Sequence, residues 1–418
     1  MAATPTVPPR TALDEPTAPI ARRWLTFWTL ANFGLFLAYY ATQQILIPRH
    51  AGAITADSAG SVWAQSTANV AAAAVGVVAP ILIGVFSDRT THTRGRRQIW
   101  VACGAVVAFA GLVAQGLQQT VLGLVLLWAF VQIGLSATTA ALNAAVPDEV
   151  PVNQRATVSA WFGVAQSLGP LLGIALVALV LTGIAPAYLA LGLCLVALAV
   201  PFSLGTRGIP LPKGGMPPVS VGSILRGIVA PLRHADFAWA WGGRFLIQLS
   251  NALGQIYLYQ YLKDRVGFDP DLGTLILVVV YAVAVTAAAL PVGRISDRSG
   301  RRKRMVVIAS VLQGVAGILL AFVPTMPGAI AGAAILGVGF GAYIAVDQAL
   351  ITQVLPRAED RGKDLGVIQI ANTVPYVFAA AVGGVVINQL GGYVTLYMLV
   401  LATAVLAALC VGPIKGVR

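Results

Sequence analysis

The sequence has few charged residues and few of the side chains that most enzymes use. Only 10% of its 418 residues are Asp, Glu, Lys or Arg, whereas soluble globular proteins carry about 25%. Its three cysteines and three histidines are scattered along the chain, without disulfide or metal-ligand spacing. No nucleophile–base pair can be recognised either. We therefore expect no enzyme activity, no metal and no cofactor.

Apolar residues dominate the chain instead, and 58% of all residues are hydrophobic. A helix needs about 20 mainly apolar residues to cross a bilayer. Twelve segments meet this requirement, so the sequence predicts an all-α polytopic membrane protein. The predicted spans are residues 24–47, 62–86, 99–117, 120–146, 156–183, 186–204, 236–262, 272–295, 305–323, 328–354, 364–390 and 392–412.

The spans form two sets of six, separated by the longest connecting segment, which is rich in Gly and Pro. Asp88 and Asp297 lie half the chain length apart, as do Pro147 and Pro356. This repetition indicates two halves of parallel topology. The predicted organisation is a flexible cytoplasmic tail at 1–22, a six-helix half at 23–205, a cytoplasmic linker at 206–235, a second six-helix half at 236–412 and a cytoplasmic tail at 413–418.

The basic residues predict how the chain is oriented in the membrane. Nearly all of the 27 Lys and Arg residues fall in the tails, or in loops on the side that holds both termini. This asymmetry predicts a multi-pass protein of the cell inner membrane with both termini in the cytoplasm. The net charge of +12 would also suit nucleic acid. Because the charges stand in short clusters between apolar spans, we expect the lipid bilayer and no nucleic acid as partner.

Two basic clusters repeat a motif, GVFSDRTTHTRGRR at 84–97 and GRISDRSGRRKR at 293–304. With this motif and its twelve spans, the sequence resembles the major facilitator superfamily of secondary transporters over residues 22–412. The longer spacer of the first copy resembles the proton-coupled sucrose and sugar symporter branch. The resemblance implies two six-helix halves with pseudo-two-fold symmetry and alternating access to a central site. It also implies a conformational latch made by Gly84, Asp88, Arg89, Arg96, Arg97, Asp297, Arg298 and Arg301.

The resemblance further implies what the latch would contact. Asp88 would face the start of the span at 364–390, where a negative charge suits the positive end of a helix. Asp297 would face the start of the span at 156–183, near Arg155.

Polar residues recur at helical spacing on the first, fourth, seventh and tenth spans. The seventh span shows the pattern best, with Arg244, Gln248, Asn251 and Gln255 on one face. Because polar side chains that face lipid are costly, these faces are expected to line a cavity. The alternative is that the amides only join helix to helix. The expected substrate-binding residues are Asn32, Tyr39, Gln43, Gln132, Asn143, Gln248, Asn251, Gln255, Tyr343, Gln369, Asn372 and Tyr376.

Arg244 and Asp347 are the ionisable residues deepest in the predicted spans. At 1.5 Å per residue they lie about 12 Å and about 10 Å from the same membrane face, so the two side chains could pair. A paired Asp347 would stay charged, whereas burial without its partner would favour the protonated form. We therefore expect the pair to couple transport to protons, the alternative being a static ion pair that fixes the packing.

The sequence thus favours a monomeric transporter that moves a small, uncharged polar solute, such as a sugar, together with protons. Amides and aromatic rings suit hydroxyl-rich solutes. The segment AQSLGPLLG at 165–173 resembles an element of drug–proton antiporters, so proton-coupled efflux of lipophilic molecules remains the alternative. A receptor that does not transport, built on the same fold, is a third possibility.

Overall fold

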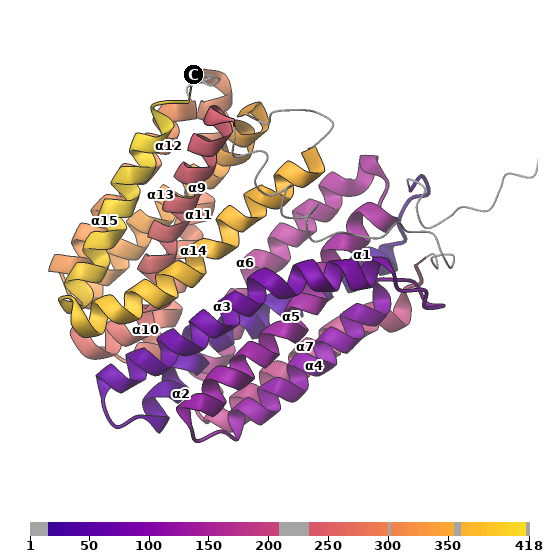
Figure 1. The fold of residues 1–418 in the computed structure, drawn as a ribbon, viewed down its shortest axis with the longest axis horizontal. Helices are drawn as coiled ribbons and strands as arrows, with labels where there is room; N and C mark the ends of the chain where they lie inside the picture. Colours follow the sequence, from indigo (N-terminus) through magenta and orange to yellow (C-terminus); the bar gives the residue numbers. More distant parts are fainter. Residues whose placement is uncertain (1–15, 209–233, 300–301, 355–360, 415–418) are drawn as a thin grey trace, which may run out of the picture.

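The computed structural model describes residues 16–208, 234–299, 302–354 and 361–414. Within these ranges, the side chains of residues 156, 290, 297, 299, 348–354 and 361–370 lie outside the description. All secondary structure in the described part of the chain is helical, which confirms the predicted all-α fold. Figure 1 shows the helices arranged as two bundles, one from each half of the chain.

The first half begins with α1 (Arg22–Ala41), a π-helical turn η1 (Thr42–Leu46) and α2 (Ile47–Ile54). The half continues with α3 (Ser58–Asp88), α4 (Gln98–Gly116), α5 (Val121–Glu149), the short turn η2 (Val152–Gln154), α6 (Arg155–Leu179) and α7 (Ile184–Gly205).

The second half begins with α9 (Ala235–Ile256), α10 (Leu258–Tyr261) and a second π-helical turn, η4 (Leu262–Val266). The half continues with α11 (Pro270–Ser299), α12 (Arg302–Phe322), α13 (Met326–Val354), α14 (Arg361–Gln389) and α15 (Gly392–Val411).

Ten of the described helices, α3–α7 and α11–α15, contain a stretch long and apolar enough to cross a membrane. The other two predicted spans are interrupted helices. The first continues as α1, η1 and α2, and the second is interrupted at Tyr257, between α9 and α10. The first contains the π-helical turn η1 and the second leads directly into η4, and such turns often mark functional sites. The two interrupted spans therefore hold corresponding places in the two halves.

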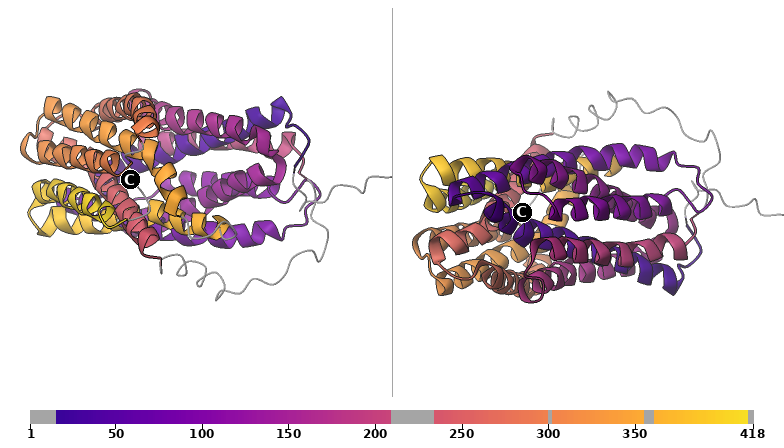
Figure 2. Two further views of the ribbon diagram at one scale, coloured as in Figure 1. Left: turned by 90° about the horizontal axis from the view of Figure 1, so that it is seen from above. Right: turned by 90° about the horizontal axis from the view of Figure 1, so that it is seen from below.

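The two halves lie side by side (Figure 2) and pack through α3 against α14 and through α6 against α11. In Figure 1 they meet near α2 and α10 and diverge toward the opposite end. We call these the closed end and the open end. Hydrogen bonds join the halves at the closed end: Gln65 donates to the carbonyl of Ile256 (2.8 Å), and Gln260 donates to Ser61 (2.6 Å).

Candidate functional site

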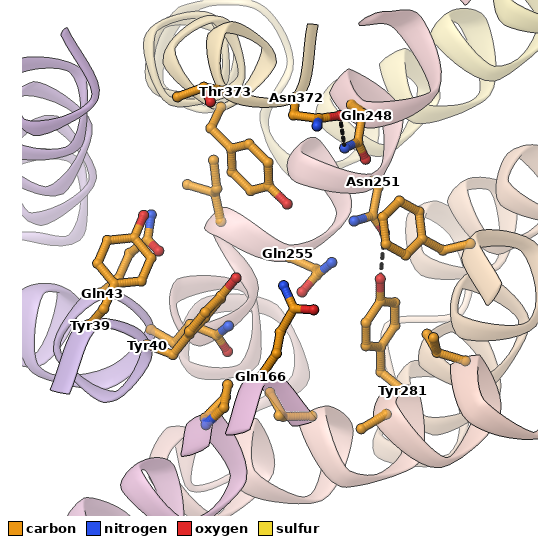
Figure 3. A pocket seen from close by; sticks show the side chains of 18 of the residues that line it. Tyr39, Tyr40, Gln43, Gln166, Gln248, Asn251, Gln255, Tyr281, Asn372 and Thr373 are labelled. Atoms are coloured by element: carbon orange, nitrogen blue, oxygen red, sulfur yellow. Dashed lines mark hydrogen bonds between the residues drawn. The ribbon is translucent and has the colours of Figure 1, made fainter. Parts of the chain in front are cut away.

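A central cavity of about 640 Å³ lies between the two halves. Its walls come from α1, η1, α3, α5 and α6 on one side, and from α9, α11, α13 and α14 on the other. Figure 3 shows amide and phenol side chains of several of these helices around a common space. Both interrupted spans contribute to the walls. The polar residue types that were expected to mark a binding site therefore converge in one place.

The structure brings together most of the residues that were expected to bind substrate. Those that line the cavity are Tyr39, Gln43, Gln132, Gln248, Asn251, Gln255, Tyr343, Asn372 and Tyr376.

Two expected residues, Asn32 and Asn143, are not part of this lining, and a third is not tested. Asn32 is buried and donates a hydrogen bond to the carbonyl of Trp28, one turn back in α1 (2.9 Å). Asn143 is exposed on α5 and lies outside the cavity wall. The side chain of Gln369 lies outside the described residues. The hydrogen bond of Asn32 gives this amide a local role in its own helix.

The lining also includes residues that the sequence did not single out, and two of them come from helices that were not expected to line a cavity. Gln166 comes from α6 and Tyr281 from α11. The phenol of Tyr281 donates to Oδ1 of Asn251 at 3.0 Å, which joins α11 to α9 (Figure 3). Tyr281 stands in the apolar run LILVVVYAVAV, and a single polar residue produces no periodic stripe. No sequence pattern therefore distinguishes it from a helix–helix contact.

The structure pairs Arg244 of α9 with Asp347 of α13. Their side chains form an ion pair and are only 6% and 7% exposed. The phenol of Tyr343 donates to Oδ1 of Asp347 at 2.5 Å. On the other side, Nε of Arg244 donates to Oδ1 of Asn372 (2.8 Å), which also accepts from Gln248 (3.1 Å). The pair thus belongs to a buried network that joins α9, α13 and α14.

A buried ion pair of this kind is difficult to break. Removing one partner leaves the other charge without compensation in a poorly hydrated site, which costs several kcal/mol. If Arg244 and Asp347 separate, something else must therefore neutralise Asp347. A proton on its carboxylate can do this, and so can a ligand group that donates to it.

The arginines of the first motif copy hold helix ends together. Arg97 contacts Asp88 at the end of α3 (2.5 Å) and Asp148 near the end of α5 (2.7 Å). Arg96 also contacts Asp148, at 2.6 Å. The same arginine, Arg97, donates to Ser87 at 2.6 Å. These contacts form one charge network at the open end, and Asp148 is a member that the sequence analysis did not identify.

The other residues predicted to form the latch say little about its contacts in this conformation. Arg89 and Arg298 are exposed, and an added Cβ on Gly84 would meet no atom within 4 Å. The side chain of Asp297 and all of Arg301 lie outside the described residues. The latch prediction is therefore not tested by these side chains.

Comparisons with known proteins agree with this architecture. A model of the Major Facilitator Superfamily matches residues 23–276 and 240–415. An uncharacterized MFS-type transporter of Schizosaccharomyces pombe is 32% identical over 135 residues, which are 32% of this chain and 30% of the relative. The chain therefore spans less than a third of the length of this relative.

Solved transporter structures share the fold at low sequence identity. The nucleoside transporter NupG superimposes with a TM-score of 0.74 at 15% identity, covering 95% of this chain and 100% of that one. A POT family transporter in complex with 5-aminolevulinic acid has a TM-score of 0.74 at 15% identity, covering 96% and 98%. An inward-facing, unoccupied bacterial homolog of the human lysosomal transporter Spinster has a TM-score of 0.64 at 14% identity, covering 93% and 94%.

Proposed function

The chain belongs to the Major Facilitator Superfamily and is a secondary transporter, and from this premise we propose that it carries a small, largely uncharged polar solute together with protons. The solute class that suits the cavity best is a sugar or a glycoside. We further propose that the protein works as a monomer in the cytoplasmic membrane with both termini in the cytoplasm. With this orientation the open end would face the cytoplasm, and the conformation would be inward-open.

The observation that carries the solute class is the chemistry of the cavity wall. Its polar residues are mainly Gln, Asn and Tyr, and its only Asp, Glu, Lys or Arg side chains among the described lining residues are the paired Arg244 and Asp347. An amide offers a donor and an acceptor together, and aromatic faces suit the apolar faces of a sugar ring. A multiply charged solute would find no free opposite charge in this wall. A neutral, hydroxyl-rich solute fits it better.

The buried pair supplies the proposed coupling to protons. Protonation of Asp347 would release Arg244, which could then turn to the solute or keep its contact with Asn372. Loss of the proton to the cytoplasm would restore the pair. Asp347 therefore acts as the proton carrier in this proposal, and Arg244 acts as its reversible partner.

Transport then follows from rocking of the two halves about the central cavity. The closed end must open while the open end closes. In the conformation that is closed at the present open end, Asp88 would leave Arg97 and contact the start of α14. The N-terminus of that helix favours a negative charge. Asp297 would take the matching place near the start of α6.

The alternative is proton-coupled efflux of a lipophilic molecule. The observation in its favour is the segment at 165–173, whose Gln166 and Pro170 line the cavity. Gly169 and Gly173 of this segment let α6 approach α1 closely. Against efflux, α5 contributes Gln132 to the cavity and carries no arginine, whereas the antiporters that this segment resembles usually have one on the corresponding helix.

Reconstituted liposomes test the two functions directly. With an imposed proton gradient, we expect saturable accumulation of a neutral hydroxylated compound from a panel of sucrose, phenyl β-D-glucopyranoside and uridine. Ethidium, a lipophilic cation, serves as the probe for efflux. Gradient-dependent movement of ethidium without movement of any panel member would contradict the proposal and favour the alternative.

A further inference from the structure

One face of α3 lines the cavity mainly with small residues, and we call this face the α3 trough. The α3 residues that line the cavity are Asn69, Ala72, Ala73 and Gly76. They recur at helical spacing and therefore share one face of the helix. Beyond Asn69 this face carries nothing larger than a methyl group. The helical rise makes this α3 trough about 10 Å long.

A side chain of α5 borders the trough. An added Cβ on Gly76 would lie 3.1 Å from Nε2 of Gln132, so the glycine leaves room for this amide at one end. Trp128 precedes Gln132 by one turn on the same face of α5. Its ring is stacked on that of Tyr39, with the centroids 6.2 Å apart and the planes at 20°. Both rings line the cavity.

Asn69 lies at the other end and is 4% exposed. Neither atom of its amide has a hydrogen-bond partner among the described residues, and Oε1 of Gln132 also lacks one. A buried polar group without a partner costs about 1–3 kcal/mol, and such groups often indicate an absent water or ligand. Among the described lining residues, Asn69 is the amide whose oxygen and nitrogen are both buried without a hydrogen-bond partner.

We propose that the α3 trough holds the ring of a neutral, hydroxylated solute and that Asn69 bridges two neighbouring hydroxyl groups of this ring. Two adjacent hydroxyl groups match the amide, because one can donate to its oxygen while the other accepts from its nitrogen. The stacked Tyr39 and Trp128 would cover an apolar face of the ring. This inference rests on the proposed function and refines it, because it makes Asn69 the residue that selects for a vicinal diol.

A matched pair of variants separates a ligand contact from a mere packing defect. Gln313 of α12 is fully buried, has no partner for either amide atom among the described residues and lies outside the cavity wall. Asn69→Leu and Gln313→Leu each remove an unpartnered amide, so both should maintain or raise the melting temperature of the ligand-free protein. Only Asn69→Leu should weaken binding of phenyl β-D-glucopyranoside, by about tenfold or more.

Deoxy forms of the same probe identify the hydroxyls. Wild-type protein should bind the 2-deoxy or the 3-deoxy glucoside about tenfold more weakly than the parent compound, whereas Asn69→Leu should bind both equally well. The inference would be overturned if Asn69→Leu bound the glucoside with wild-type affinity, or if Asn69→Leu and Gln313→Leu lost affinity equally. Either result would leave the proposed function intact. If the wild-type protein binds neither this glucoside, sucrose nor uridine, the proposed function fails, and the inference fails with it.

Discussion

Arg49 and Asp271 form an ion pair of 2.7 Å across the closed end, between the first and second halves. Arg49 also donates to the carbonyls of Leu181 (3.0 Å) and Val177 (3.4 Å) at the end of α6. Asp271 lies in the first turn of α11. Each charge is therefore stabilised by a helix end in addition to its partner. The pair connects halves that must separate here if the transporter opens to the other side.

We predict that Arg49→Gln and Asp271→Asn each shift the population toward the conformation that is open at the α2 end. The side chains are 13% and 24% exposed, so solvent weakens the pair, and we expect a coupling of about 1 kcal/mol. Such a change alters the ratio of conformations about fivefold. Distances between spin labels on α2 and η4 would measure the shift.

Arg265→Gln is the control, because Arg265 is exposed at the same end of the molecule. This variant should leave the distance distribution unchanged. If Arg49→Gln has no larger effect than the control, Arg49 does not contribute to closing this end. Additive effects of the two substitutions in the double variant would show that the residues act separately.

For the central pair, we predict that Asp347→Asn abolishes accumulation driven by a proton gradient while exchange of solute across the membrane continues. The amide keeps the size and the hydrogen-bonding oxygen of the carboxylate but cannot carry the proton. Uptake and counterflow in the same liposomes measure the two activities. Full accumulation by Asp347→Asn would exclude Asp347 as the proton carrier.

The thermal stability of Asp347→Asn tests whether Arg244 and Asp347 stabilise the protein as a pair. Asp347→Asn leaves Arg244 as a buried charge without its partner, and breaking such a pair costs about 3–5 kcal/mol. Arg244→Gln combined with Asp347→Asn removes both charges and should restore much of the melting temperature. A double variant that is no more stable than Asp347→Asn alone would argue against this coupling.

The membrane fold could be predicted because the bilayer imposes a simple length requirement on each apolar segment. Helix ends were less predictable. The span expected at 62–86 begins at Ser58, because the side chain of Asp57 accepts a hydrogen bond from Gly60 at 2.8 Å and caps the helix. The π-helical turns η1 and η4 have no distinct sequence signature.

The candidate site could be predicted only where polar residues form a stripe. Arg244 and Asp347 were paired correctly because the helical rise places both at similar depth. Asp148 was missed because a carboxylate in a loop sequence normally faces solvent, whereas here it binds Arg96 and Arg97. Such a partner depends on how α3, α4 and α5 meet, and no local pattern encodes it.

For the latch, we predict that Asp88→Asn favours the conformation that is open at the cytoplasmic end. The neutral amide would interact less well with the start of α14 in the closed conformation. It also loses the ion pair with Arg97 in the open conformation, but Asp88 is 43% exposed there and Arg97 keeps its contact with Asp148, so this loss is smaller. A cysteine placed at Gln166, which lines the cavity, should then react several-fold faster with a reagent added from the cytoplasmic side, in a background without the three native cysteines.

Ser87→Ala provides the control for this measurement. Ser87 also contacts Arg97, but it carries no charge. The latch requires that Asp88→Asn has a clearly larger effect than Ser87→Ala. Equal reaction rates in wild type and Asp88→Asn would show that Asp88 does not hold the cytoplasmic end closed.

The last prediction concerns the close contact between α6 and α1. An added Cβ on Gly173 would overlap the carbonyl oxygen of Leu37, whereas one on Gly163 would meet nothing within 4 Å. Gly173→Ala should therefore push the helices apart and destabilise the protein by about 1–3 kcal/mol, while Gly163→Ala should be tolerated. Melting temperature and uptake should both decrease in the first variant, because α1 and α6 also carry cavity residues. Equal stability of the two variants would show that α1 can move away from α6 without cost.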